Sequence, residues 1–127
     1  LTSTINGILA QRLVRRLEPT HAERYEASPE EIERFDLRRL QPDGTIYLYR
    51  PKPSALAPTG YLGRTTIMEF LVMNDALRRA VMRRDGMGEI ERIAREAGMR
   101  TMYEDGLSKA LSGQTTLEEV LRVTEEG

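Results

Sequence analysis

The chain is 127 residues long and almost neutral, with 19 Lys and Arg against 20 Asp and Glu. Near-neutrality disfavours a nucleic-acid-binding protein, because such proteins usually carry a net basic surface, and the absence of cysteine excludes disulfides and thiolate metal sites. No apolar run approaches the roughly 20 residues that span a bilayer, so the sequence predicts one small domain, or two or three subdomains, in the cytosol.

The first predicted element covers residues 4–17, TINGILAQRLVRRL. Its apolar residues recur three and four positions apart, which predicts a helix with one apolar face. They are Ile5, Ile8, Leu9, Leu13 and Leu17. Pro19 ends this predicted helix. Because the chain starts within this pattern and without methionine, we expect it to be a piece of a longer protein.

A short helix is predicted to begin near residue 29. Ser28 is suited to the N-cap, Pro29 to the first helical position, and Glu31 completes a capping box. Together these three residue types indicate a helix start more strongly than any one of them does alone.

Two strands are predicted next, at residues 45–50 and 65–73, from alternating polarity and from β-branched and aromatic content. The connector 51–60 contains three prolines and therefore excludes a regular ladder. Two strands this close in sequence most simply pair with each other as an antiparallel ribbon. Such a ribbon is marginal in water by itself, so it has to pack on a neighbouring element.

The remaining residues predict helices with marked starts and ends. An apolar stripe through residues 90–97 is closed by Gly98. The glutamates of 30–31 and 118–119 suit solvated helix starts. The predicted caps are Asn74 or Asp75, Thr101 with Glu104, and Thr115 with Glu118, and the predicted i,i+4 ion pairs are Glu91–Arg95 and Glu118–Arg122.

Residues that would carry catalysis are scarce. No window has the glycines and lysine of a phosphate-binding loop. His21 has no partner nominated by the sequence, so we expect a surface or structural histidine. Two arginine groups leave two interpretations open: a solvated face, or an interface that pairs with carboxylates or phosphates. The groups are Arg12, Arg15 and Arg16, and Arg78, Arg79, Arg83 and Arg84.

Three stretches in series carry a family resemblance. They are AQRLVRRL at 10–17, TGYLGRTTIMEFLVMND at 59–75, and AREAGMRTMYEDGLSKALSGQTTLEEVLRVT at 94–124. In this order they resemble the C-terminal region of the hexameric secretion ATPases of the GspE/PilB family, which serve type II secretion and type IV pilus assembly. The resemblance implies an α+β, mostly helical fold in three units: 1–17 as the last helix of a RecA-like core, 18–73 as a β-ribbon subdomain of zinc-knuckle type, and 74–127 as a C-terminal helical subdomain.

The chain departs from this family at the knuckle. The family's Cys-Pro-x-Cys falls on Glu18, Pro19, Thr20 and His21, and its second cysteine pair falls on Pro53 and Leu56. A structural zinc needs four donors, so we expect no zinc and a core that replaces it. The candidates for that core are Leu17, Ile46, Leu48, Leu56 and Tyr61.

The resemblance also implies what lies outside this chain. ATP and Mg²⁺ would bind upstream, so the full-length protein would be an ATPase and this part alone would not. Gln11 and Arg12 become candidates near the nucleotide, and Arg64, Glu69, Arg78 and Arg83 candidates for coupling or for interfaces.

The partners implied are the upstream domains, the neighbouring subunits of a homo-hexamer and inner-membrane platform proteins. We expect no nucleic acid and no direct membrane insertion, and a cytoplasmic location peripheral to the inner membrane. The alternative is a free-standing helical module for protein interaction or nucleic-acid binding.

Overall fold

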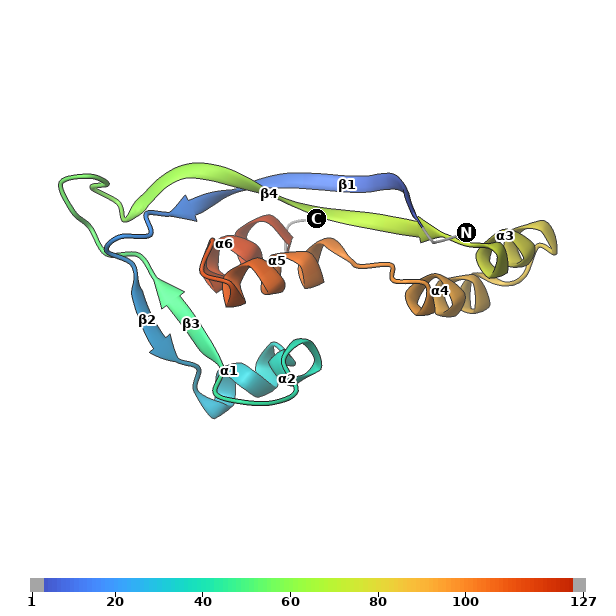
Figure 1. Ribbon diagram of the computed structural model, residues 1–127, viewed down its shortest axis with the longest axis horizontal. Coiled ribbons are helices and arrows are strands. Elements are labelled where there is room, and N and C mark those ends of the chain that lie inside the picture. The colour runs from blue at the N-terminus through green and yellow to red at the C-terminus, as the bar shows by residue number, and fades with distance from the viewer. Residues whose placement is uncertain (1–3, 125–127) are drawn as a thin grey trace.

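The longest elements are two antiparallel strands, β1 (Thr4–Leu17) and β4 (Tyr61–Met73), which pair into a ribbon (Figure 1). The computed structural model describes residues 4–124; residues 1–3 and 125–127, the outer ends of the first and third predicted units, lie outside this range. The other elements are β2 (Glu23–Glu26), α1 (Pro29–Arg34), α2 (Leu37–Leu40), β3 (Tyr47–Arg50), α3 (Asp75–Met82), α4 (Met87–Glu96), α5 (Met102–Leu111) and α6 (Leu117–Thr124). The α+β class is confirmed. Within 4–124 no helix is both long and apolar enough to cross a membrane.

Residues 4–17 form a strand, so the predicted helix, and with it the last helix of a RecA-like core at 1–17, is wrong. The register shows why the spacing misled. Two steps along β1 match one step along β4 between Ile5 and Gly7, and again between Ile8 and Ala10. Each such bulge adds one residue and turns a strand spacing of two into three, while a spacing of four suits a strand and a helix equally.

The predicted pairing of the two strands is also wrong. β4 pairs with β1, and β3 pairs instead with β2, so one two-stranded ribbon is nested inside the loop of the other. The short β2, with sequence ERYE, was not predicted, because three of its four side chains are charged and exposed. Only pairing with the more apolar β3 makes it a strand.

The helix starts agree with prediction at three sites. Ser28 and Glu31 form a complete capping box on α1, and Thr101 and Glu104 form another on α5. Asn74 caps α3 by accepting the N–H of Leu77 at 2.8 Å. Gly98 follows the C-cap of α4 with a φ of +108°, as expected.

The start of α6 differs by one residue from the prediction. Thr116, rather than Thr115, accepts the N–H of Glu119 at 3.2 Å. Thr115 is instead buried and donates its hydroxyl to the carbonyl of Arg15 at 2.7 Å. Arg122 pairs with Glu119 at 2.9 Å, one residue from the predicted Glu118, whereas the predicted pair Glu91–Arg95 is present at 3.4 Å.

The largest core joins the two predicted subdomains on either side of residue 73. It combines the unit between β1 and β4 with α5 and α6, which lie beneath the middle of the ribbon in Figure 1. Its buried members include Phe35, Leu37, Ile46, Leu48, Leu107, Ala110, Leu117 and Val120. Each Å² of apolar surface that this core removes from water stabilises the fold by about 25 cal/mol.

The prediction of an apolar core in place of the zinc site is partly correct. Leu17, Ile46 and Leu48 are each about 1% exposed. Leu56 is 61% exposed, so its predicted burial is wrong. It lies in a bend closed by reciprocal backbone hydrogen bonds between Ser54 and Ala57, and Ala57 is the residue of that bend that is buried.

A second, smaller core lies at the far end of the ribbon. There α3 and α4 pack on each other and on the last residues of β4 through Leu77, Ala80, Ile93 and Ala94. In Figure 1 these two helices lie at the opposite end of the ribbon from β2 and β3. The two packed regions therefore lie at different positions along the ribbon.

Candidate interaction surfaces

The predicted nucleotide-proximal residues lie on β1. Gln11 is exposed opposite Met68 in the register, and Arg12 lies opposite Ile67. The Arg12 guanidinium donates to the carbonyl of Val123 at 2.7 Å. Arg12 thus binds the last turn of α6, while Gln11 is solvent-facing.

The structure brings Arg12 and Glu69 to one hollow of about 280 Å³ between the ribbon and helices α5 and α6. Thr101, Tyr103 and Thr124 complete its polar lining. Arg64 lies elsewhere, exposed and opposite Arg15 at the other end of β4. Of the strand candidates, therefore, only Arg12 and Glu69 share a site.

The predicted coupling arginines, Arg78 and Arg83, are exposed at the α3 end. Arg78 pairs with Asp75 at 3.3 Å. Arg83 donates to both oxygens of Asp85, at 3.4 and 2.9 Å, and this hydrogen bonding raises the pKa of its guanidinium. Because both cations are paired within their own segment and in solvent, they contribute little stability.

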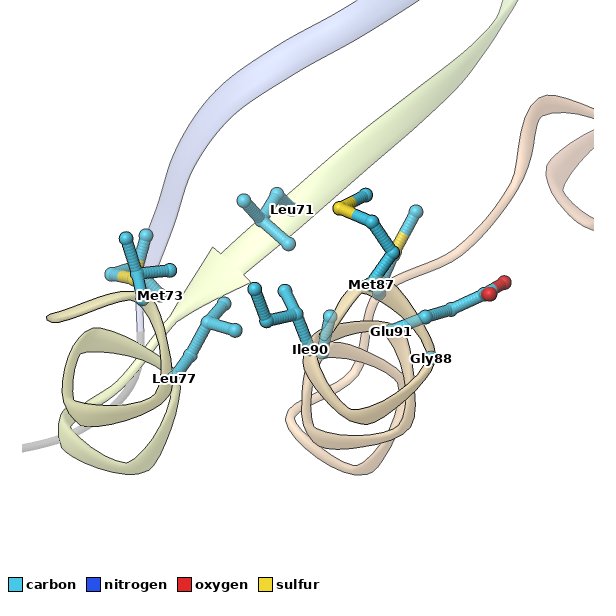
Figure 2. Close-up of a pocket in the computed structure, with 10 residues that line it drawn as sticks. Leu71, Met73, Leu77, Met87, Gly88, Ile90 and Glu91 are labelled. Atoms are coloured by element: carbon cyan, nitrogen blue, oxygen red, sulfur yellow. The ribbon is translucent and has the colours of Figure 1, made fainter. Parts of the chain in front are cut away.

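An apolar groove of about 350 Å³ lies between the end of β4, α3 and α4 (Figure 2). Its labelled lining includes Leu71, Met73, Leu77, Met87 and Ile90, with Glu91 pointing away at the rim. Met87 is 79% exposed. Sequence reasoning missed this groove, since an exposed methionine after a DG turn looks like loop.

The outer face of the ribbon carries a second apolar surface. Ile8, Leu9, Leu13 and Leu62 are each exposed by half or more. Among the described residues, β1 pairs only with β4, so its other edge leaves backbone groups without a ladder partner. We call these four side chains and this edge the ribbon face. An exposed apolar strand with an open edge is a template for pairing with another chain segment.

The charged side chain that sequence reasoning placed wrongly is Glu119. It was predicted to lie on a solvated face but is only 1% exposed. Its carboxylate accepts the backbone N–H of Arg15 at 2.7 Å, the Arg15 Nε at 3.1 Å and the Arg122 Nη2 at 2.9 Å. Burial would raise the pKa of Glu119, yet these hydrogen bonds from Arg122 and Arg15 outweigh it and lower the pKa to about 2.

Asp105 plays a similar part on α5. It is 7% exposed and accepts the backbone N–H of Met68 at 2.9 Å and the Lys109 ammonium at 3.2 Å. Lys109 also donates to the carbonyl of Thr66. Buried carboxylates on α5 and α6 thus fasten both helices to the strands of the ribbon.

Chemically, the arrangement is built for contact between surfaces. Across residues 4–124, no group of three His, Asp or Glu side chains is placed to hold a metal ion. The carboxylates of Glu119 and Asp105 accept hydrogen bonds from other groups of the chain. The apolar features exposed on the described surface are the groove of Figure 2 and the ribbon face.

Comparison with known proteins gives the chain relatives. Residues 1–122 match the family described as type II/IV secretion system protein. The chain is 82% identical over 126 residues to the type II secretion system protein E of Xanthomonas campestris pv. campestris, which covers 99% of this chain and 22% of that protein. It is 40% identical to the type IV pilus assembly ATPase PilB of Thermus thermophilus, over 14% of that protein, and 41% identical to the type II secretion system ATPase E of Vibrio cholerae, over 24%. The chain spans less than a quarter of each of these relatives.

Proposed function

The chain belongs to the type II/IV secretion system protein family, and we propose that it is the C-terminal part of a hexameric ATPase that powers type II protein secretion or type IV pilus assembly. ATP and Mg²⁺ would bind upstream of Leu1, since none of the 127 residues forms a phosphate-binding loop. This part would serve docking and coupling. The assembled protein would lie in the cytoplasm, against inner-membrane platform proteins.

The ribbon face is the observation that carries the proposal. Ile8, Leu9, Leu13 and Leu62 place apolar side chains in water, beside a strand edge that no other described strand pairs. Helices α5 and α6 pack against the ribbon, as a two-stranded ribbon requires, but these four side chains remain exposed. We infer that the upstream part of the ATPase covers this face, and that Gln11, exposed on the same strand, lies toward the nucleotide-binding part.

The α3 end would then transmit movement. It lies at the far end of β4 from the β2–β3 unit, and its Arg78 and Arg83 are exposed. The ribbon joins the face that we propose is docked to a distant pair of helices, and would act as a lever that carries nucleotide-driven movement to a neighbouring subunit or platform protein. Arg64 and Glu69 are proposed as interface residues along the same lever.

The experiment that tests the proposal uses the full-length gene. Leu9→Glu with Leu13→Glu places two charges on the ribbon face, and we expect loss of hexamer assembly and of ATP hydrolysis. The matched control is Leu56→Glu, since Leu56 is 61% exposed and is not one of the four side chains of the ribbon face. The control should assemble and hydrolyse ATP like the parent.

Circular dichroism of the 127-residue chain with the same substitutions separates docking from folding. Leu9 and Leu13 are half exposed, so both variants should keep the parent spectrum. A full-length Leu9→Glu, Leu13→Glu protein with parental assembly and turnover would show that the ribbon face is not the docking surface.

A further inference from the structure

The unit between the two strands of the ribbon packs on α5 and α6 through the largest core, and its two chain connections to the ribbon meet at one place. The chain leaves β1 at Leu17 and enters β4 at Tyr61, which lie opposite each other in the register. The Leu17 N–H donates to the carbonyl of Gln114 at 2.9 Å, and the Glu18 N–H donates to the carbonyl of Gly60 at 3.0 Å. Three segments far apart in sequence therefore meet at residues 17–18.

The side chain at the centre of this joint is a carboxylate. Glu18 is 2% exposed. It accepts the backbone N–H of Thr20 at 2.6 Å, the backbone N–H of His21 at 3.2 Å and the Nδ1 of His21 at 2.7 Å. Pro19 has no N–H, so the first backbone donors after Glu18 are those of Thr20 and His21. Both donate to the Glu18 carboxylate. Both carboxylate oxygens are engaged.

The family resemblance places a zinc knuckle here, and the residues present do not fit zinc. The four ligand positions hold Glu18, His21, Pro53 and Leu56. Proline and leucine side chains donate nothing to a metal, Leu56 faces solvent, and both oxygens of Glu18 are already hydrogen-bonded within the turn. Tetrahedral zinc requires four nitrogen, sulfur or oxygen donors.

We propose that the buried carboxylate of Glu18 takes the place of the metal: it gathers the donors of the turn 18–21 and so sets the direction in which the β2–β3 unit leaves the ribbon. A zinc knuckle holds such a turn through an ion taken up from solution, whereas Glu18 holds it through hydrogen bonds from groups of the chain itself. The orientation of the β2–β3 unit is then independent of zinc supply.

The second half of the former knuckle is held by close backbone packing instead of by ligands. Ser54 and Ala57 exchange backbone hydrogen bonds at 3.0 and 3.2 Å. Gly60 approaches Pro51 so closely that a Cβ at position 60 would lie 2.5 Å from the Pro51 Cβ. The connector thus presents the Gly60 carbonyl to Glu18 without a metal bridge.

The test compares Glu18→Gln with Glu33→Gln in the 127-residue chain. Glu33 is an exposed glutamate of α1, so its variant controls for the loss of one charge. Amide hydrogen exchange reports the turn directly: we expect protection at Thr20 and His21 to fall at least tenfold in Glu18→Gln and to stay unchanged in Glu33→Gln. Equal protection in the two variants would overturn the proposal.

Should Glu18→Gln fail to fold, His21→Leu repeats the test at a residue whose side chain is 44% exposed. It removes one donor to the carboxylate, and we expect a folded protein in which the amide at position 21 is less protected, relative to its intrinsic exchange rate, than in the Glu33→Gln control. Parental exchange in His21→Leu would contradict the role of the carboxylate.

Zinc itself provides the last arm. Equimolar zinc or excess EDTA should leave the thermal midpoint of the parent chain unchanged, and one bound equivalent of zinc would refute the inference. In a variant carrying Glu18→Cys, His21→Cys, Pro53→Cys and Leu56→Cys, the protection at residues 20 and 21 should become zinc-dependent. Full protection in EDTA would show that neither a metal nor Glu18 organises this turn.

Discussion

Arg15 and Glu119 lie 104 positions apart in sequence, yet the Glu119 carboxylate accepts both the backbone N–H and the guanidinium of Arg15, at 2.7 and 3.0 Å. Thr115 engages the other backbone group of Arg15, its carbonyl, at 2.7 Å. The N-terminal end of α6 therefore replaces a neighbouring strand at this point of β1. A bulged strand end with satisfied N–H and C=O groups can be buried without the cost of unpaired polar groups.

Replacing this carboxylate should weaken the fold. Glu119→Gln leaves one acceptor oxygen for the four hydrogen bonds that Arg15 and Arg122 donate to the carboxylate and removes the charge that faces them, so we expect a loss of about 1–3 kcal/mol in the free energy of unfolding. Glu118→Gln, at the exposed neighbouring position, is the control and should change stability by less than about 0.5 kcal/mol. Urea denaturation measures both; similar midpoints would contradict the assignment.

Acid should destabilise the protein through two buried carboxyls. The pKa of Glu18 is lowered to about 2, first by the hydrogen bond with His21 and then by the Thr20 N–H. The pKa of Glu119 is likewise about 2 despite the opposing effect of burial. Both ordinary values are 4.5, so the unfolded chain binds more protons below about pH 5.

The stability that these two groups contribute is therefore complete above about pH 5 and is lost as the pH falls toward 2. Urea midpoints measured at several pH values between 7 and 3 should decline over this range. In a Glu18→Gln, Glu119→Gln variant the decline should be shallower. Parallel pH profiles for parent and variant would assign the acid sensitivity to other groups.

A methyl group at position 60 should be costly. Gly60 has a φ of +86°, and a Cβ there would lie 2.5 Å from the Pro51 Cβ and 2.8 Å from the Lys52 nitrogen. We expect Gly60→Ala to lower the free energy of unfolding by roughly 2–5 kcal/mol, from left-handed strain and overpacking together.

Gly63 offers the matched control. Its φ is +78°, but nothing lies within 4 Å of a Cβ there. Gly63→Ala should therefore cost only the conformational term of about 1–2 kcal/mol. Thermal unfolding of both variants separates strain from crowding, and equal losses would mean that contact with Pro51 does not matter.

The purified chain should not hydrolyse ATP. No stretch of its sequence has the glycine and lysine pattern of a phosphate-binding loop, and phosphoryl transfer depends on positioning the phosphates and Mg²⁺. Phosphate release with Mg-ATP should match that of a heat-denatured sample. Turnover that persists through repurification and exceeds this blank would defeat the expectation.

The sequence by itself determined the features that depend on residues close together in the chain. The capping boxes at Ser28 and Thr101, the cap at Asn74 and the stop at Gly98 were all predicted, because each is made by groups within three or four positions of one another. The strand predicted at 65–73, which lies within β4, was found for a similar reason, since β-branched and aromatic residues are concentrated there.

Only the tertiary structure decided which strands pair and which charges are buried. The spacing of the apolar residues in 4–17 is compatible with a helix and with a strand that contains two bulges. The segment adopts the strand because it pairs with β4, which begins at Tyr61. Glu119 reads as a solvated helix residue until Arg15 is placed beside it. From the sequence, Glu18 only occupies the position of a zinc-binding cysteine. The structure shows that its carboxylate accepts the backbone N–H groups of the turn that follows it. Strand pairing and the burial of charged side chains depend on contacts between residues far apart in sequence. The local sequence of either partner shows no periodic pattern from which such a contact can be inferred.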